Sequence, residues 1–139
     1  VYPPRAWPPA DHVSFRARGG PWPPHCIAGT RGAAFAPGLR LPASAIVISK
    51  AEHADRDAYS GFDGTDLEQQ LRAAGVRRLC VGGLATDYCV RATVLDARRL
   101  GFEVVLLPDA VRAVDVTAGD GERAIATMVA AGATLAEHA

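Results

Sequence analysis

A cysteine at the junction of two expected elements is the strongest candidate for chemistry in this chain. Cys89 closes the segment GGLATDYC at residues 82–89, and the segment after it, residues 90–100, ends before Gly101. Apolar residues three to four positions apart in that second segment predict an amphipathic helix, and glycine is common just beyond a helix C-terminus. At a helix start, backbone amides and the helix dipole favour a thiolate and can hold an oxyanion. Cys89 is therefore a candidate nucleophile, the alternative being a cysteine that is simply buried.

A lysine stands at the end of another apolar run. Residues 45–49 (AIVIS) are rich in β-branched side chains and predict a buried strand, with Lys50 at its C-terminal end. Ligand sites of open α/β sheets gather at that edge, where an ammonium group favours the thiolate of a neighbouring cysteine and stabilises negative charge. The alternative is a lysine that extends into solvent as the strand ends.

Two short stretches bring further polar and aromatic groups. The proline-rich loop at residues 21–26 (PWPPHC) presents Trp22 and His25, and residues 58–62 (AYSGF) form a small aromatic patch that includes Tyr59. Both stretches could line a pocket. The alternatives are that Trp22 and the second patch only cover the core, and that His25 makes one hydrogen bond.

The composition excludes several classes of function. The 139 residues suffice for one domain with a packed core, and 15 basic residues balance 15 acidic ones. Neither nucleic acid nor a membrane surface is therefore an expected partner. No apolar run approaches the ~20 residues of a membrane span, and no signal-peptide pattern opens the chain. Three irregularly spaced cysteines argue against a disulfide framework, so we expect a cytoplasmic protein. Cys80 lies in the middle of an expected strand and is expected in the core.

Elements are expected on both sides of the cysteine. Four prolines in the first ten residues predict a loop there. Thr65 and Glu68 form a capping box that starts a helix ending before Gly75. Residues 78–82 predict a strand.

After residue 100 we expect a strand at 102–107 that ends at Pro108, then a helix at 122–131, then a short strand at 134–136. In the helix, Ile125, Met128 and Val129 are expected to face inward. Strands that alternate with helices predict an α/β fold with a parallel sheet covered on both faces.

The motifs together resemble the nicotinamidase branch of the isochorismatase-like cysteine hydrolases, almost continuously from His12 to Leu135. The resemblance is carried by residues 12–15 (HVSF), 19–26 (GGPWPPHC), 48–50 (ISK), 57–62 (DAYSGF) and above all 83–90 (GLATDYCV). It implies a three-layer αβα sandwich with a mainly parallel sheet, and a single isochorismatase-like hydrolase domain over residues 1–139.

The resemblance also implies an activity. In this family an Asp-Lys-Cys triad hydrolyses an amide through a thioester, and the match places the nucleophile on Cys89 and the lysine on Lys50. The oxyanion hole falls on the backbone amides of Ala85 and Cys89, after a cis peptide bond that follows Leu84. Nicotinamide would be converted to nicotinic acid and ammonia in pyridine-nucleotide salvage. Asp87 matches a family position that has no acid–base role.

Substrate and metal residues follow from the same match. Trp22, Tyr59 and Leu84 fall at substrate-binding positions, and a flat aromatic ring suits stacking on an indole. Members bind a divalent ion, commonly zinc, iron or manganese, through an Asp-Trp-His-Pro motif and a later histidine. His25 matches that later histidine, and His12 matches a histidine that joins the metal shell in some members.

The chain departs from the family in two places. Ala6 and Pro8 replace the aspartate and the histidine of the metal motif, which puts the metal in doubt. No segment matches the Asp-x-Gln-Asn-Asp-Phe-like motif that carries the catalytic aspartate at the end of the first strand. We therefore expect a chain truncated at its N-terminus that lacks the first, central strand.

Two alternatives to nicotinamide hydrolysis stay open on the sequence. One is a related amidase that keeps Cys89 and acts on another small amide. The other is a non-catalytic or impaired remnant of the fold, which the absent aspartate favours. Exposed sheet edges and the habit of the family favour self-association into a homo-oligomer.

Overall fold

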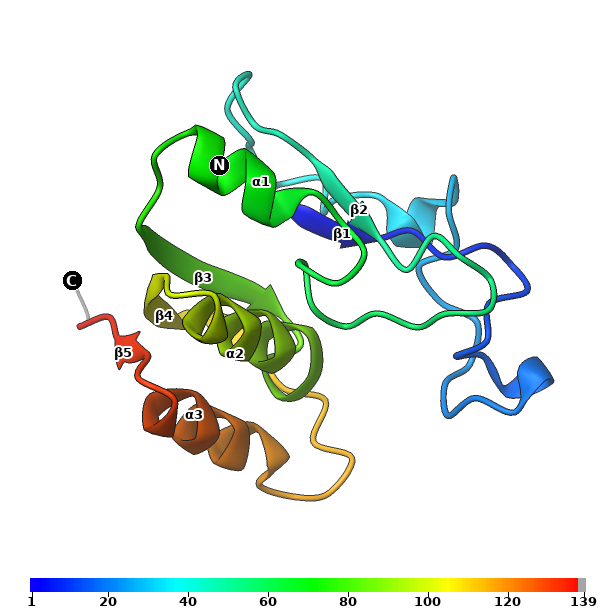
Figure 1. Ribbon diagram of the computed structural model, residues 1–139. Helices are drawn as coiled ribbons and strands as arrows, with labels where there is room; N and C mark the ends of the chain where they lie inside the picture. The colour runs from blue at the N-terminus through cyan, green and yellow to red at the C-terminus, as the bar shows by residue number, and fades with distance from the viewer. Residues whose placement is uncertain (138–139) are drawn as a thin grey trace. The chain divides into compact units, whose positions relative to one another are not determined.

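The chain folds into two compact units that meet in sequence at the start of the first α-helix. A computed structural model describes residues 1–137 (Figure 1). The first unit spans Val1–Leu67 and the second begins at Glu68. Each unit has its own parallel sheet, of two and of three strands. The predicted single domain over residues 1–139 stays a prediction.

The first unit is built on two short parallel strands. Strand β1 (Pro4–Ala6) pairs with β2 (Ile48–Lys50), and Ala6 lies opposite Lys50 in the register. Two single-turn 3₁₀ helices, η1 (Arg16–Arg18) and η2 (Arg31–Ala33), interrupt the long connection between the strands. The strand predicted at residues 45–49 is therefore present, although its regular part begins later and includes Lys50.

The prediction of a loop over the first ten residues is wrong for Pro4–Ala6. A proline lacks an amide hydrogen, yet its neighbours still pair. The amide of Ile48 donates to the carbonyl of Pro3 (3.1 Å), and the amide of Trp7 donates to the carbonyl of Lys50 (2.9 Å). Pro4 is the first residue of the strand, a position where no ladder donor is required.

A close backbone contact fixes the loop that carries Trp22. The amide of Trp22 donates to the carbonyl of Ser14 (3.0 Å), and the amide of Gly20 donates to the carbonyl of Phe15 (3.0 Å). A Cβ atom at Gly20 would lie only 2.2 Å from the backbone of Ser14, so this approach requires glycine. Phe15 is buried, which anchors both segments.

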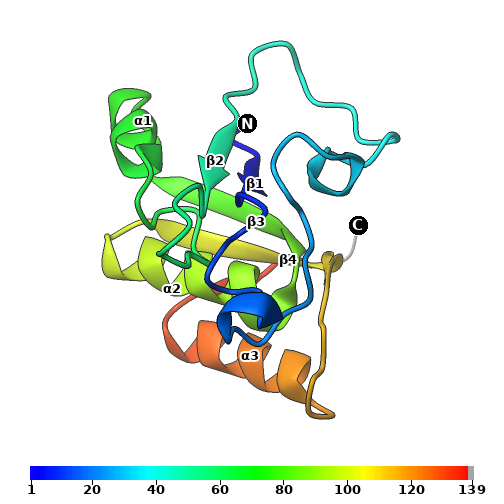
Figure 2. The same ribbon diagram turned by 90° about the vertical axis from the view of Figure 1, so that its right-hand side faces the viewer.

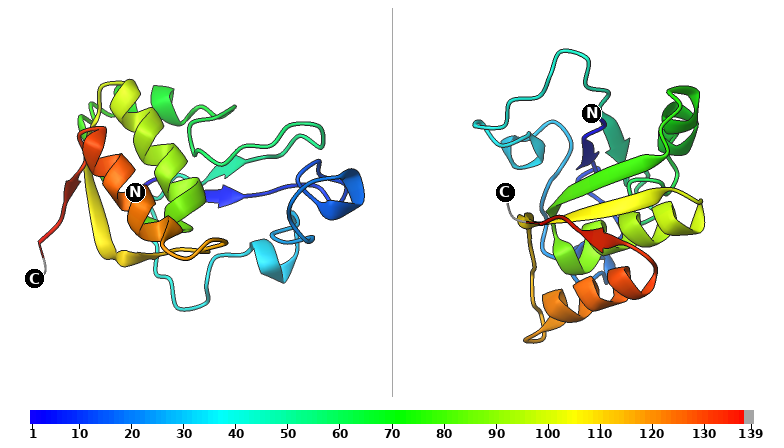
Figure 3. Two further views of the ribbon diagram at one scale, coloured as in Figure 1. Left: turned by 90° about the horizontal axis from the view of Figure 1, so that it is seen from below. Right: turned by 90° about the vertical axis from the view of Figure 1, so that its left-hand side faces the viewer.

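The second unit is an α/β unit with parallel strands in the order β3–β4–β5. Its elements are α1 (Leu67–Ala73), β3 (Arg78–Leu84), a π-helical turn η3 (Thr86–Val90), α2 (Arg91–Arg99), β4 (Glu103–Arg112), α3 (Asp120–Ala130) and β5 (Thr134–Leu135). Helices α2 and α3 pack against each other and lie on the same side of β3 and β4 (Figures 2 and 3). The predicted α/β class with parallel strands is confirmed.

Half of the predicted capping box forms at the start of α1. The hydroxyl of Thr65 accepts a hydrogen bond from the amide of Leu67 (3.3 Å), as expected of an N-terminal cap. The carboxylate of Glu68 instead pairs with Arg72 one turn later (3.0 Å). An ion pair with this spacing stabilises an exposed helix surface by ~0.3–0.5 kcal/mol. The guanidinium of Arg72 also lies 4.8 Å from the ring centroid of Phe102.

Pro108 does not end β4, contrary to the prediction. The pairing with β3 shifts between Val81, which lies opposite Leu106, and Gly83, which lies opposite Val111. Four residues of β4, 107–110, thus face a single residue of β3. Such an irregularity accommodates a proline inside a strand because no ladder hydrogen bond is needed there.

The prediction that Cys80 belongs to the core is also wrong. Side chains alternate along β4, and Val104 and Leu106 are buried. Cys80 is paired with Val105 and therefore projects from the opposite face, where it is exposed. A mid-strand position alone does not tell which face a side chain takes.

The inward face of α3 differs by one position from the predicted one. Ala124 and Met128 are buried with 1% and 0% exposure, whereas Val129 is 45% exposed. The buried residues include Gly121 and therefore follow a spacing of three and four, which turns Val129 out of the interface.

Truncation of these neighbours on α3 should have very different effects. We expect Met128→Ala to lower the free energy of unfolding by about 2–5 kcal/mol, because it removes a fully buried side chain. The matched control Val129→Ala should change it by less than about 0.5 kcal/mol. Denaturant titration of both variants measures the difference, and equal losses would contradict the burial described above.

Candidate active site

The candidate nucleophile lies in a wide turn between β3 and α2. The peptide bond between Leu84 and Ala85 is cis, as the resemblance implied. The π-helical turn η3 follows, and the amide of Val90 donates to the carbonyl of Ala85 (3.0 Å). Cys89 is half-buried in this turn, and its carbonyl accepts a hydrogen bond from the hydroxyl of Thr93 (2.7 Å). Isolated π-helical turns often occur at functional sites.

The turn changes where the helix begins. The amphipathic helix predicted from residue 90 starts at Arg91, because the π-helical turn includes Val90. Ala85 and Cys89, predicted to supply the oxyanion hole, lie in one turn of backbone. Leu84, predicted to touch the substrate, is 72% exposed at the end of β3. These three positions therefore lie together at the C-terminal edge of a parallel sheet, where ligands of α/β folds bind.

A buried carboxylate holds this turn to the segment after β4. Asp87 is 7% exposed, and its oxygens accept hydrogen bonds from the amides of Val114 (3.0 Å) and Asp115 (2.9 Å). Sequence reasoning gave Asp87 no role and did not find Asp115. The two amides that Asp87 binds lie 27 and 28 residues away along the chain, so no local pattern points to them.

The candidate lysine is buried in the first unit. Lys50 is the only lysine among 15 basic residues of the chain, and it is 6% exposed. Its Nζ donates to the carbonyl of Ala58 (3.1 Å). The alternative of a side chain extending into solvent is therefore wrong. A buried basic residue that is lysine, in a chain that otherwise uses arginine, suits a site that needs a compact ammonium group.

The aromatic residues of the first unit meet each other. The indole Nε1 of Trp22 donates to the phenol oxygen of Tyr59 (2.9 Å). The ring of His25 lies edge-on to Phe15 (5.6 Å between centroids) and to Trp22 (6.4 Å). Tyr59 follows Ala58, whose carbonyl receives the Lys50 ammonium. The predicted substrate residues Trp22 and Tyr59 are thus hydrogen-bonded to each other, and Tyr59 is the neighbour in sequence of the residue that binds Lys50.

The implied metal site lacks two of its donors, and the two histidines that remain make other contacts. Ala6 and Pro8 offer no side-chain ligand. His12 is 1% exposed, with Nδ1 at 2.7 Å from the Ser14 hydroxyl and Nε2 at 3.0 Å from the carbonyl of Arg56. His25 is exposed, with Nδ1 at 2.8 Å from the carbonyl of Pro23. Within residues 1–137, no three His, Cys, Asp or Glu side chains are grouped so that they could hold an ion.

The predicted site residues are divided between the two units. Lys50, Trp22, Tyr59 and His25 belong to the first, and Leu84, Ala85 and Cys89 belong to the second. The structure brings together the members of each set. Among the described residues, no helix combines the length and the apolar character that crossing a membrane requires.

Comparison with known proteins gives one consistent family. The isochorismatase domain family matches residues 2–139. The chain is 39% identical over 150 residues to a nicotinamidase of Escherichia coli strain K12, an alignment that covers 93% of this chain and 70% of the relative.

Solved structures agree with that match. The chain is similar to the pyrazinamidase of Pyrococcus horikoshii solved in complex with zinc, with 49% identity and a TM-score of 0.93 over 99% of this chain and 75% of that one. It is also similar to PnC1 of L. infantum solved in complex with nicotinate, with 39% identity and a TM-score of 0.90 over 98% of this chain and 70% of that one.

Proposed function

The chain belongs to the isochorismatase domain family, and on this basis we propose that it hydrolyses nicotinamide to nicotinic acid and ammonia, with Cys89 as the nucleophile. The observation that carries the proposal is the position of Cys89 in the turn between β3 and α2. Backbone amides at such a turn can stabilise both a thiolate and an oxyanion. The similarity to nicotinamidases supports the substrate.

The reaction proceeds in two steps through a thioester. The Cys89 thiolate attacks the carboxamide carbon, and the carbonyl oxygen becomes an oxyanion that the amides of Ala85 and Cys89 hold. The C–N bond then breaks, and ammonia leaves with the proton that the Cys89 thiol gave up. In the family an aspartate carries this proton, and because no segment of these 139 residues matches its motif, a water molecule carries it in the reaction proposed here. Water attacks the thioester, releases nicotinic acid and returns the thiol. The match to the family gives Lys50 the part of stabilising negative charge during both steps, and it gives Trp22, Tyr59 and Leu84 the part of binding the substrate.

Ammonia release from nicotinamide by the purified 139-residue chain tests this function. Pyrazinamide and an N-carbamoyl amino acid serve as competing substrates in the same assay. Preference for nicotinamide supports the proposal, and preference for the carbamoyl compound would assign the chain to another amidase of the family. If the chain hydrolyses none of them and iodoacetamide does not modify Cys89, the chain is a non-catalytic remnant.

We expect this chain to bind zinc, iron or manganese at less than ~0.1 equivalent, because Ala6 and Pro8 cannot act as ligands and the ring nitrogens of His12 are already hydrogen-bonded. Metal analysis of the purified protein measures this, and a chelator should leave hydrolysis unchanged. The double variant Ala6→Asp, Pro8→His should gain close to ~1 equivalent of zinc. Adding His25→Gln to that variant is the control and should reverse the gain. A stoichiometric metal in the unmodified chain would contradict this expectation.

The cellular setting follows from the same proposal. Nicotinamide hydrolysis returns the ring to pyridine-nucleotide synthesis. Among the described residues, Cys26, Cys80 and Cys89 form no disulfide, which suits the reducing cytoplasm. The proposal also includes self-association into a homo-oligomer, which unpaired sheet edges favour in general.

A further inference from the structure

We propose that Asp87 is a positioning residue, whose carboxylate ties the Cys89 turn to the segment at residues 113–117, here called the strap, and so fixes the amides that hold the oxyanion. This inference deepens the proposed function, because it takes Cys89 as the nucleophile. It gives the strap, which lies outside the residues predicted to react or to bind the substrate, a part in the reaction.

Two backbone amides of the strap donate to the carboxylate of Asp87, and this contact is here called the clamp. The amides of Val114 and Asp115 both donate to the Asp87 carboxylate, at 3.0 and 2.9 Å, one to each oxygen. Asp87 is buried, so water cannot readily replace either bond. Hydrogen bonds to an ionised acceptor are about twice as strong as neutral ones. The strap is thereby held directly against the turn that contains Cys89.

The strap is also hydrogen-bonded to the start of α3. Asp115 has a left-handed backbone (φ 53°), and its Oδ1 accepts a hydrogen bond from the amide of Gly121 (2.8 Å). A Cβ atom at Gly121 would lie 2.6 Å from the Cβ of Ala113, so glycine is needed for this close approach. The strap therefore bridges two elements, the Cys89 turn and the first turn of α3.

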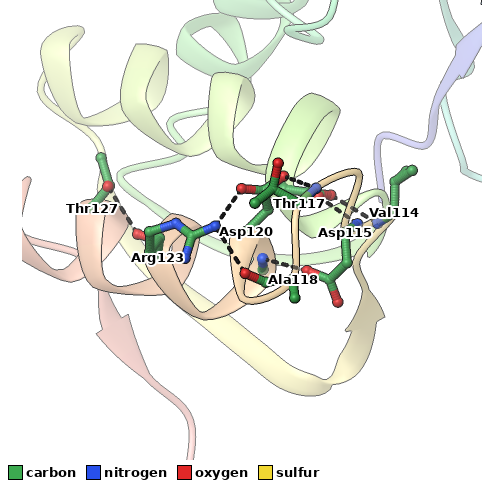
Figure 4. Close-up of polar contacts among 9 residues, drawn as sticks. Val114, Asp115, Thr117, Ala118, Asp120, Arg123 and Thr127 are labelled. Atoms are coloured by element: carbon green, nitrogen blue, oxygen red, sulfur yellow. Dashed lines mark hydrogen bonds and ion pairs between the residues drawn. The ribbon is translucent and has the colours of Figure 1, made fainter.

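A second acidic residue closes the loop that follows the strap (Figure 4). Asp120 accepts hydrogen bonds from the amide of Thr117 (2.9 Å) and from Arg123 (2.6 Å), which also donates to the carbonyl of Ala118 (3.1 Å). The Thr117 amide, and then Arg123, hold the pKa of Asp120 below its ordinary value. Among the hydrogen bonds of residues 1–137, Asp120 reaches the strap at Thr117 and makes none to the Cys89 turn. It is therefore a suitable control.

The two converging donors explain why the clamp is an aspartate. An asparagine of the same shape offers one acceptor and one donor, so it can accept from only one of the two amides. The other amide would face an N–H group in a buried place. The predicted consequence is a loosened turn, and a misplacement of about 1 Å at a reacting group can lower a rate about a hundredfold.

The experiment compares Asp87→Asn with Asp120→Asn by two measurements. The first is hydrogen exchange of the amides at residues 85–90 and 113–117. The second is the ratio between two reactions of Cys89. Pyridine-3-carboxaldehyde adds the thiol across its carbonyl to form a hemithioacetal, whose oxygen occupies the oxyanion position. Iodoacetamide alkylates the thiol and releases iodide without forming an oxyanion. Peptide mass spectrometry follows Cys89 apart from Cys26 and Cys80.

We expect Asp87→Asn to lose about tenfold or more of its amide protection in both segments and about tenfold or more of its affinity for the aldehyde. Its alkylation rate should change by less than about threefold, because alkylation needs no oxyanion hole. Asp120→Asn should leave residues 85–90 and the aldehyde affinity unchanged. A general loss of stability would instead affect both reactions of Cys89.

Unchanged hydrogen exchange at residues 85–90 in Asp87→Asn would overturn the inference, as would equal losses in the two reactions. Asp115→Gly is the second variant, in case Asp87→Asn fails to fold. It removes the bond to Gly121 but keeps the amide that Asp87 binds, and it should weaken aldehyde binding several-fold. Unaltered aldehyde binding in this variant would also count against the clamp. A wild-type chain that shows the clamp in hydrogen exchange but does not bind the aldehyde would overturn the proposed function instead.

Discussion

Replacing Cys89 by alanine is expected to lower nicotinamide hydrolysis by at least about a thousandfold. The variant has no nucleophile, and the amides of the turn alone cannot form a thioester. Removal of the nucleophile from comparable catalytic groups lowers kcat by up to about a millionfold. The fold should tolerate the change, since Cys89 is only half-buried and the residue removed is small. Ammonia release under saturating nicotinamide gives the ratio directly.

Two other cysteines provide matched controls for this prediction. Cys80 projects from the exposed face of β3, and Cys26 lies in the loop after His25. Alanine at either position removes a thiol of the same kind outside the π-helical turn, so hydrolysis should stay within about twofold of the unmodified chain. If Cys80→Ala or Cys26→Ala abolishes hydrolysis while Cys89→Ala does not, the nucleophile has been assigned to the wrong residue.

The sequence was sufficient for elements whose signals are local. Gly75 and Gly101 follow helices that end where the periodicity ends, and both have positive φ. The junction at Cys89 could be found because an apolar run, a glycine pair and an amphipathic segment follow one another directly. Lys50 could be placed at a strand end for the same reason. These features depend on neighbours within a few positions.

Features that depend on distant partners could not be found in this way. β1 forms because it pairs with β2, which lies more than 40 residues later in the chain. There the amide of Ile48 donates to the carbonyl of Pro3, which no local pattern shows. Pro108 is tolerated because the register with β3 shifts beside it. Cys80 and Val129 were assigned to the wrong faces because periodicity alone does not show which side a neighbouring element covers. Asp87 is the clearest case, since its importance lies in two amides beyond β4.

The second large effect is expected at the only lysine. Lys50→Met should lower kcat/KM for nicotinamide by about a hundredfold to a thousandfold, because a methionine fills a similar volume but carries no charge to stabilise the oxyanion. It should also slow the alkylation of Cys89 by iodoacetamide, because the proposed function has the Lys50 ammonium act on the reactions of Cys89. Lys50→Arg should not restore activity, because a planar guanidinium does not replace a compact ammonium in a buried place.

The control variant Arg5→Met tests whether the loss of any cation from this sheet has the same effect as the loss of Lys50. The Arg5 guanidinium lies on the same two-stranded sheet, stacks on Trp7 at 3.6 Å and donates to the hydroxyl of Ser49 (3.0 Å). Both substitutions remove one cation and a hydrogen-bond donor from neighbouring strands, so their effects on stability should be similar, about 1–3 kcal/mol. Only Lys50→Met should affect hydrolysis and alkylation. Equal losses of activity in the two variants would mean that Lys50 supports the fold of β2 and does not act on Cys89 or its substrate.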